Sequence, residues 1–254
     1  MSQRCGSLFA AALFVLVAVG ALGAQSTLRV VATNSWTAAF AVAAGATSVV
    51  TLAPNELRHP AEYELKPSDV EALKGADLIV YTGFEVMAQK LGDAAGRQSI
   101  RMLKIDADYT DAVLRASLTS LGDALGTSAI AQANLATLEA YLASWKKELS
   151  DAGLAGAPVV VHVFQAPLMK ELGLQVAGVF GPGPLEAAQI AKLSPVGARL
   201  IVDNWHNEAG GPLRETMKKA RYASLINFPG PDGTKSLLDV LADDRARLKA
   251  AAGY

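Results

Sequence analysis

The feature that most constrains the fold is a set of short apolar runs, each separated from the next by a stretch with helical signals. Leu78–Tyr81 (LIVY) is apolar throughout, which is typical of a strand buried on both faces of a parallel sheet. The stretch before it begins at Pro67, which cannot continue a preceding helix, and ends at Gly75, which favours a left-handed helix end. Ser68 or Asp69 can cap the helix between them. This alternation predicts an α/β fold with parallel sheets.

The apolar runs form two series along the chain. The predicted strands are Leu28–Thr33, Ser48–Ala53, Leu78–Tyr81 and Met102–Ile105 in the first series, and Pro158–Phe164, Gln175–Phe180, Ala198–Asn204 and Ala223–Phe228 in the second. Further helices are predicted at Trp36–Gly45, Glu85–Gly92, Pro167–Leu172, Leu185–Leu193 and Pro212–Ala220. Two α/β lobes follow from this repetition.

The stretch between the two series has no glycine or proline. In Thr127–Leu149 apolar residues recur at helical spacing, so we predict one helix of roughly 35 Å, either a surface helix or a connector between the lobes. The expected architecture is two parallel-sheet lobes joined by one long connecting helix, with a cleft between them. The expected limits are 25–126 for the N-terminal lobe, 127–150 for the helix and 151–254 for the C-terminal lobe.

The first 24 residues have the pattern of a signal peptide. Arg4 precedes the apolar run Leu8–Leu22, and Ala21–Ala24 provides the small residues of a cleavage site. The alternative is a membrane anchor, but an uncharged run of roughly 16 residues is shorter than the ~20 that span a bilayer. We therefore predict secretion, cleavage near Gln25 and a periplasmic mature protein.

Composition excludes several classes of partner and site. The chain has 23 basic and 24 acidic residues, without the basic surface of a nucleic-acid-binding protein. Its single cysteine, Cys5, lies before the apolar run of the signal. Disulfides and cysteine-ligated metal sites are therefore not expected in the mature chain, and any metal must be held by nitrogen and oxygen.

The three histidines all lie near the ends of predicted strands. His59 follows the second strand, His162 is near the end of the fifth, and His206 follows the seventh. Because the carboxyl ends of parallel strands line the ligand crevice of α/β proteins, the three imidazoles could converge on one ion. A histidine on an apolar strand, such as His162, is also commonly a core residue, so position alone leaves both interpretations open.

The run HPAEYELKPSDVEALKGADLIVYTGFE (His59–Glu85) resembles the zinc- and manganese-binding solute-binding proteins of ABC transporters. A more moderate similarity continues through VVVHVFQAPLMKELGLQVAGVF (Val159–Phe180). The resemblance implies a monomer that binds a divalent metal ion between two lobes joined by a long helix. It also implies delivery of that ion to an ABC permease in the inner membrane.

The resemblance also implies a ligand set. His59 takes the place of the family's first histidine after a two-residue shift, and His162 matches the second directly. No histidine stands at the third position, so His206 is expected there, with Glu186 or an aspartate as the next candidate. At the fourth position the chain has Asn227, and asparagine is a poor zinc ligand beside a carboxylate. We therefore include Asp203 in the set as the oxygen ligand. The alternatives are Asp232, Glu62, Asn227 and water. Three imidazoles favour Zn²⁺, with Mn²⁺ or another divalent ion as the alternative.

The expected function is capture and delivery of a metal ion without catalysis. One alternative is an exported zinc-dependent hydrolase that uses the same histidines, but the chain has neither a His-Glu-x-x-His helix nor a nucleophile elbow. Another alternative is a protein that binds a metal chelate or other small solute in the same fold.

Overall fold

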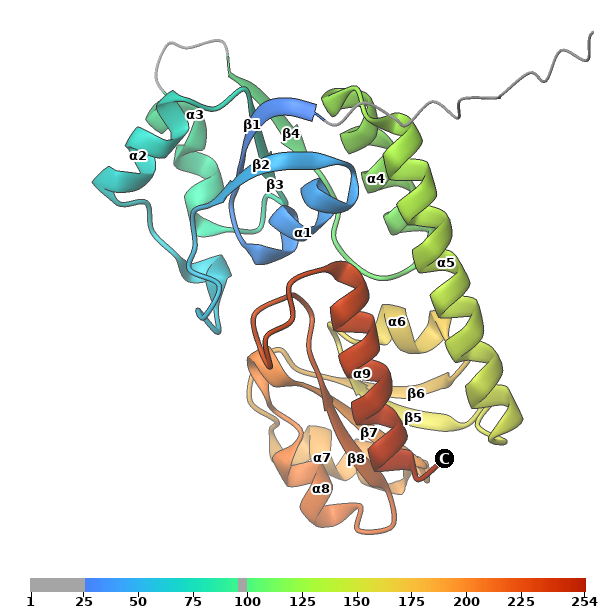
Figure 1. Cartoon of the computed structure of the whole chain (residues 1–254). Helices are drawn as coiled ribbons and strands as arrows, with labels where there is room; N and C mark the ends of the chain where they lie inside the picture. The colour runs from blue at the N-terminus through green and yellow to red at the C-terminus, as the bar shows by residue number, and fades with distance from the viewer. Residues whose placement is uncertain (1–25, 96–99) are drawn as a thin grey trace, which may run out of the picture.

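The computed structural model describes residues 26–95 and 100–254, so the predicted signal peptide (1–24) lies outside the described residues. The described chain forms two four-stranded parallel sheets with strand orders β2-β1-β3-β4 and β6-β5-β7-β8 (Figure 1). The same strand order therefore occurs in both lobes. The predicted fold class, two parallel-sheet lobes with one long helix between them in the sequence, is confirmed.

The elements follow one another in the alternating order expected. The N-terminal lobe contains β1 (Ser26–Ala32), α1 (Ser35–Ala43), β2 (Ala46–Thr51), α2 (Pro67–Lys74), β3 (Leu78–Tyr81), α3 (Leu91–Ala95), β4 (Arg101–Lys104) and α4 (Asp111–Leu125). Helix α5 spans Ser128–Asp151. The C-terminal lobe contains β5 (Pro158–His162), α6 (Ala166–Glu171), β6 (Gln175–Phe180), α7 (Ala187–Leu193), β7 (Leu200–Asn204), α8 (Gly211–Thr216), β8 (Arg221–Leu225) and α9 (Leu237–Ala252). Short 3-10 turns are η1 (Pro60–Glu62), η2 (Val86–Lys90), η3 (Ser194–Val196) and η4 (Trp205–Asn207).

Several local predictions need correction. Helices α4 and α9 were not predicted, and the helix expected at Glu85–Gly92 is a 3-10 turn followed by the short α3. Helix α2 begins at Pro67 as expected. Asp69, however, reaches back to the preceding loop, where its Oδ2 accepts hydrogen bonds from the Lys66 amide (2.7 Å) and the Tyr63 hydroxyl (2.9 Å). The carboxylate thus ties the loop that contains His59 to the start of α2.

Each sheet is buried on both faces, which explains why its central strands are apolar throughout. In the N-terminal lobe Val30 and Leu78 face one apolar cluster, whereas their neighbours Val31 and Ile79 face another. Successive side chains of a strand point to opposite faces, so a strand covered by helices on both sides has no polar face. The central strands of the C-terminal lobe follow the same rule.

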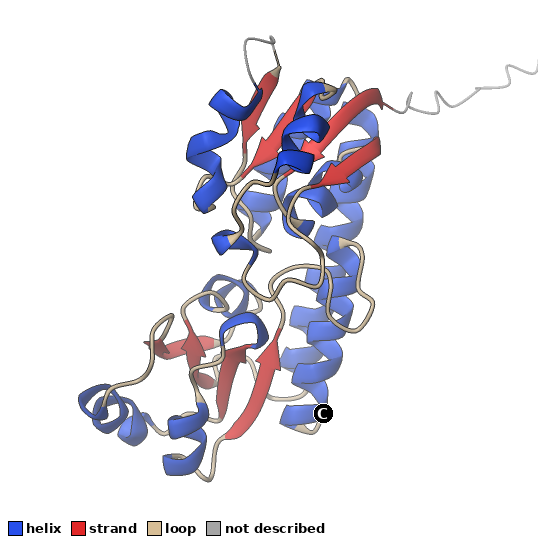
Figure 2. Cartoon of the chain, turned by 90° about the vertical axis from the view of Figure 1, so that its left-hand side faces the viewer, coloured by secondary structure: helices blue, strands red, loops and turns tan. Residues whose placement is uncertain are grey.

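Helix α5 runs alongside both lobes, as Figure 2 shows from the side. Its 24 residues correspond to a length of about 36 Å. It packs against α1 and α4 in the N-terminal lobe and against α9 in the C-terminal lobe. Among the residues that the structure describes, no helix is both long and apolar enough to cross a membrane.

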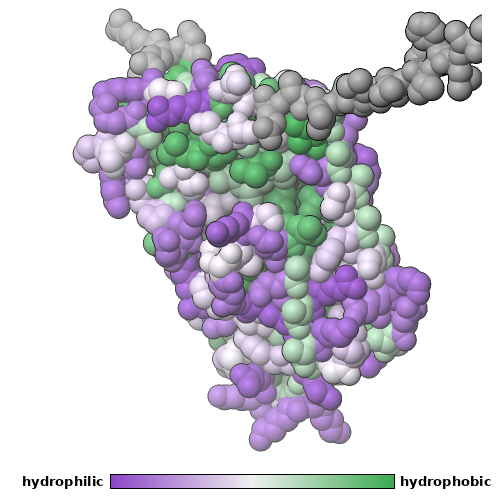
Figure 3. Space-filling model, viewed as in Figure 1, coloured by the Kyte–Doolittle hydropathy of each residue, from purple (hydrophilic) through white to green (hydrophobic). Residues whose placement is uncertain are grey.

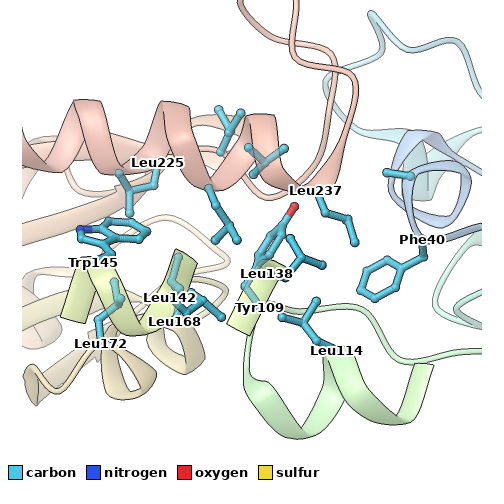
Figure 4. Close-up of a cluster of buried hydrophobic side chains, with 14 of the residues drawn as sticks. Phe40, Tyr109, Leu114, Leu138, Leu142, Trp145, Leu168, Leu172, Leu225 and Leu237 are labelled. Carbon is cyan, nitrogen blue, oxygen red and sulfur yellow. The ribbon is translucent and has the colours of Figure 1, made fainter. Parts of the chain in front are cut away.

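One hydrophobic cluster extends through both lobes. Leu138, Leu142 and Trp145 of α5 share this cluster with side chains of the N-terminal lobe, such as Phe40, and of the C-terminal lobe, such as Leu225 (Figure 4). All five are nearly or fully buried. The lobes are therefore held together by a shared core along α5.

The outer surface is mixed. In the view of Figure 3 apolar residues gather over the N-terminal lobe, and the C-terminal lobe presents mostly polar residues.

Candidate functional site

A cavity of about 540 Å³ lies between the two lobes, where the carboxyl ends of the central strands meet. In each sheet the chain order reverses at the central strands (β1 and β3; β5 and β7), and such switch points are where α/β folds bind ligands. The residues that line it end or follow seven of the strands, namely β1, β2, β3, β4, β5, β7 and β8. They are Asn34, Trp36, Arg58, His59, Pro60, Ala61, Glu62, Phe84, Ala107, Asp108, Val163, Phe164, Pro167, Asn204, His206, Asn207, Asn227 and Phe228.

Direct contacts join the two lobes at the cavity. The Arg58 guanidinium, on the loop after β2, donates hydrogen bonds to the Trp205 carbonyl and lies over the Trp205 ring, 4.7 Å from its centroid. It also pairs with the Glu208 carboxylate at 3.4 Å. The Ser35 hydroxyl donates to the Pro229 carbonyl at 2.7 Å. Residues far apart in the sequence thus hold the two walls of the cavity together.

His206 is buried in the C-terminal wall of the cavity and is 4% exposed. Its ring lies against Phe228, with centroids 3.6 Å apart, and against Trp205. Burial, together with the positive charges of Arg58, His59 and Arg247, lowers the pKa of His206 to about 3. The imidazole is therefore neutral at ordinary pH, which is the form that binds a metal.

His162 is fully buried at the end of β5, behind the cavity wall. Its ring packs against Phe164 and Phe180. A Cβ on Gly181 would lie 2.4 Å from His162 Nε2, so only glycine leaves room for the ring there. Burial lowers the pKa of His162, although the charge of Asp203 opposes the shift. This imidazole is neutral as well.

Both buried imidazoles have one nitrogen without a partner. Nδ1 of His162 accepts the Phe164 amide and Nδ1 of His206 accepts the Asn227 amide, each at 3.2 Å. Nε2 of each ring is buried and has no hydrogen-bond partner among the residues that the structure describes. A neutral ring that accepts at Nδ1 carries its proton on Nε2. Binding an ion at Nε2 therefore requires the proton to move to Nδ1 and Nδ1 to leave the backbone amide.

His59 lies on the exposed loop after β2 and lines the N-terminal side of the cavity. It is close enough to His206 for its charge to lower the His206 pKa. His162 does not line the cavity with them. Over residues 26–95 and 100–254, no three histidine, cysteine or acidic side chains form a group able to hold a metal ion in this conformation.

Asp203 is buried at the end of β7, and its carboxylate has a full set of structural partners. Oδ1 accepts the amides of Asn204 and Ala209, and Oδ2 accepts the Gly210 amide at 2.7 Å and the Tyr222 hydroxyl at 2.8 Å. Burial and these contacts with Asp203 raise the pKa of Tyr222. To bind an ion, Asp203 would have to give up part of this network.

The other candidates for the oxygen ligand occupy different positions. Glu62 and Asn227 line the cavity, but the Asn227 Oδ1 already accepts a hydrogen bond from Gln165 at 2.6 Å. Asp232 pairs with Arg247 and is not among the lining residues. Asp108, which the sequence analysis did not single out, also lines the cavity. Glu62 and Asp108 are therefore the carboxylates nearest to the open space.

Glu85, which follows β3, lies near the cavity, and its role there was not predicted from the sequence. It is 2% exposed, and its carboxylate accepts hydrogen bonds from the Thr33 hydroxyl, the Asn34 side chain and the amides of Thr82 and Gly83. Burial alone would raise the pKa of Glu85, but hydrogen bonds, first among them that from Thr33 and then those from Thr82, outweigh it and lower the pKa. Glu85 thus joins the ends of β1 and β3 and positions Asn34 at the cavity. The sequence did contain a signal for Glu85, since it is a single acidic residue shortly after an apolar strand.

The comparisons with known proteins agree with this architecture. Residues 30–117 match the family model described as zinc-uptake complex component A, periplasmic. None of the curated protein sequences matches significantly. Three similar solved structures, described next, share 12–17% identity with this chain, a level at which the likeness concerns the fold.

These three structures illustrate the likeness. The laminin-binding protein Lbp of Streptococcus pyogenes has a TM-score of 0.69 at 16% identity, with 90% of this chain and 100% of that chain covered. The solute-binding protein FpvC of Pseudomonas aeruginosa in complex with Ni²⁺ has a TM-score of 0.67 at 17% identity, covering 89% and 97%. The Mn-bound periplasmic metal-binding protein of Candidatus Liberibacter asiaticus has a TM-score of 0.63 at 12% identity, covering 89% and 99%.

The resemblance seen in the sequence is therefore confirmed both by a match to a family model and by a likeness in fold, and the two cover different parts of the chain. The sequence match covers most of the N-terminal lobe and the start of α4, and the likeness in fold covers both lobes. The chain shares the fold of these solved structures, and residues 30–117 match the family model of the periplasmic zinc-uptake complex component A in sequence.

Proposed function

We propose that the protein captures a divalent metal ion in the cleft between its lobes and delivers it to an ABC permease in the inner membrane. The observation that carries the proposal is His206, a buried and neutral imidazole in the cavity wall whose Nε2 has no partner. A buried nitrogen without a partner is rare in folded proteins and calls for an explanation. An ion bound at Nε2, once the proton has moved to Nδ1, supplies one. We further propose binding without catalysis, as is usual for solute-binding proteins.

The proposed ligand set is His59, His162, His206 and Asp203. Neutral imidazoles are the form that metals bind, and the lowered pKa values of His162 and His206 keep both rings in that form. His162 lies behind the cavity wall, so its Nε2 reaches an ion only if the segment around Gly181 moves away. Asp203 has to exchange at least one of its four hydrogen bonds for the ion.

Zinc is the ion that we propose. Three imidazoles and one oxygen are a usual zinc set, whereas harder ions prefer more oxygen ligands. The family description names zinc uptake, although the similar structures include one with Ni²⁺ and one with Mn²⁺. We propose a periplasmic, monomeric protein with a cleaved signal at 1–24, which fits the word periplasmic in the family description.

The first prediction concerns the three histidines. Replacing His59, His162 or His206 by alanine removes one of the three nitrogen ligands that the mature chain offers. We expect each variant to bind zinc at least about tenfold more weakly, since even losses around the ligands cost ~10–100-fold. The measurement is zinc affinity by competition with a chromophoric chelator.

Circular dichroism serves as the folding control for these variants, and turnover assays with peptide, ester and phosphate substrates test the absence of catalysis. A folded His206→Ala variant that binds zinc like the parent would exclude His206 from the ligand set. Hydrolysis that a chelator and His162→Ala both abolish would contradict the proposal of binding without catalysis.

A further inference from the structure

We infer that the cleft holds its metal as a complex with a small organic carboxylate rather than as a bare ion. The inference rests on the proposed function and names the chemical form of the cargo. Three observations support it: the size of the cavity, the aromatic side chains in its walls, and a buried hydrogen-bond donor in one wall that has no partner among the described residues.

The cavity is larger than a metal ion requires. Its volume is about 540 Å³. An ion with six waters, at about 30 Å³ of liquid volume each, occupies roughly 180 Å³. Pockets for small organic ligands, by contrast, range from about 300 to 1,000 Å³. The cavity thus has room for an organic ligand around the ion.

Aromatic side chains form much of the wall. Phe84 after β3 and Phe164 after β5 are 58% and 49% exposed, although both are large apolar residues. Trp36 and Phe228 also line the cavity, and their rings are 5.9 Å apart. A bare, strongly hydrated ion gains nothing from such walls, whereas the carbon skeleton of an organic ligand can cover them.

Three lining residues, Trp36, Asn204 and His206, have a buried polar atom without a partner among the described residues, and that of Asn204 is a hydrogen-bond donor. Asn204 is fully buried at the end of β7 and lines the cavity. Its Oδ1 accepts the His206 amide at 3.2 Å, which fixes the orientation of the side-chain amide. Nδ2 is therefore the free end, and within residues 26–95 and 100–254 it has no hydrogen-bond partner. An amide N–H₂ cannot bind a metal ion, but it can donate to a carboxylate.

Arg58 adds the positive charge that a carboxylate needs. Its guanidinium lines the same cavity and already binds one carboxylate, that of Glu208, at 3.4 Å. Both side chains are about half exposed, at 45% and 46%, so this pair can exchange partners. Guanidinium groups match the two oxygens of a carboxylate in a bidentate geometry. The carboxylate of the cargo can therefore take the place of Glu208.

The remaining charged groups suit the cation. His59, Glu62 and Asp108 line the cavity alongside Arg58 and Asn204. Carboxylate oxygen and imidazole nitrogen are ligands for divalent metals, whereas Arg58 and Asn204 can only donate hydrogen bonds through their free groups. The lining thus contains partners for both parts of a metal carboxylate.

The test uses metal-free protein and three probes, namely ⁶⁵Zn²⁺ alone, ¹⁴C-citrate alone and an equimolar mixture of the two. Equilibrium dialysis measures how much of each label the protein retains. We expect the mixture to be retained with zinc and citrate in equal amounts, and citrate alone to bind at least tenfold more weakly than in the mixture.

Asn204→Asp tests the donor directly. The substitution keeps an oxygen that accepts the His206 amide and replaces the free N–H₂ by a second oxygen. We expect the ratio of zinc-citrate affinity to zinc affinity to fall at least tenfold. Asn207→Asp is the matched control, because it adds the same charge to the cavity wall where the amide nitrogen already donates to the Pro182 carbonyl at 3.0 Å. Arg58→Gln, at a partly exposed site, should lower the ratio as well.

The outcomes separate the inference from the proposed function. Zinc retained equally well with and without citrate would overturn the inference and leave the proposed function intact. Failure to retain zinc in either form would overturn the proposed function itself. Citrate bound equally well without zinc would overturn the inference, and so would equal losses in Asn204→Asp and Asn207→Asp. If Asn204→Asp does not fold, an unchanged ratio in Arg58→Gln overturns it.

Discussion

Two buried carboxylates show how the surroundings of a single residue decide its charge. Glu85 accepts several hydrogen bonds, and they lower its pKa despite burial. Asp244 of α9 is fully buried and only its Oδ1 is paired, with the Ile226 amide at 2.7 Å. Burial therefore raises the pKa of Asp244 well above its usual value of 3.8. The nearby Tyr109 hydroxyl also lacks a partner, and its pKa is raised by burial and by Asp244.

The next prediction is a pH dependence that belongs to Asp244. Above pH 3.8, and up to its raised pKa, the folded protein binds this proton and the unfolded chain does not. The free energy of unfolding therefore falls as pH rises through that window. Asp244→Asn keeps an oxygen for the Ile226 amide and removes the titration, so its advantage over the parent should grow with pH. Urea unfolding of both proteins at several pH values from about 4 to 7 measures this.

Asp151→Asn is the matched control, because Asp151 is exposed and pairs with Lys147 on the helix surface. Its difference from the parent should stay small and nearly constant with pH, as expected of an exposed ion pair. Parallel profiles for the parent and Asp244→Asn would contradict the prediction.

At the scale of elements, the contact between α4 and α5 depends on a glycine. Gly122 is buried in α4, and a Cβ there would lie 2.7 Å from the Ala131 Cβ and 3.1 Å from the Ser128 Cα of α5. Since Ser128 contributes backbone, the contact cannot be relieved by turning a side chain. Gly126 follows with a left-handed φ of 72° and reverses the chain between the two helices. Small residues thus set the distance at which α4 supports the connecting helix.

Gly122→Ala should lower the free energy of unfolding by about 1–3 kcal/mol, because overpacking a close contact outweighs the gain in helix propensity. Gly92→Ala is the matched control, since Gly92 also lies in a helix but a Cβ added there would have no atom of the described part of the chain within 4 Å. There the same substitution should stabilise by roughly 0.5–1 kcal/mol. Denaturant unfolding of both variants checks the opposite signs, and a stabilised Gly122→Ala would contradict the packing argument.

At the scale of the whole molecule, the lobes meet at two places. The shared core along α5 holds one side, and contacts across the cavity hold the other. Among the latter, Gly230 has a φ of 140°, and a Cβ there would lie 2.4 Å from the Asn55 carbonyl oxygen of the N-terminal lobe. We propose that residues 25–126 and 151–254 act as two domains, and that they close over the cargo at the contacts across the cavity.

Gly230→Ala should separate the lobes at the cavity while the shared core stays intact. We expect zinc affinity to fall at least about tenfold, since each 1.4 kcal/mol of lost contact corresponds to a factor of ten. Small-angle X-ray scattering should show a larger radius of gyration for the zinc-loaded variant. Gly233→Ala is the control, because Gly233 also has a left-handed φ of 77° but no atom within 4 Å of an added Cβ. Equal effects of the two substitutions would show that backbone strain alone is responsible.

The sequence by itself determined the fold class, because burial of a strand on both faces leaves a local apolar signature. The sequence also contains helix-capping residues for α4 and α9, the two helices that were not predicted. Thr110 caps α4, and the Ser236 hydroxyl accepts the Asp239 amide at the start of α9. The three histidines were recognisable as candidates because each stands near a strand end, where α/β folds bind ligands.

Only the tertiary structure decided what those candidates can contact. It placed His162 behind Gly181, satisfied the Asp203 carboxylate with Gly210 and Tyr222, and brought Arg58 to Trp205 across 147 positions of sequence. The periodicity of strands and helices depends on neighbouring residues and is therefore visible in the sequence. The environment of a side chain in the cleft depends on how two separate sheets pack on one long helix, and no local pattern encodes that arrangement.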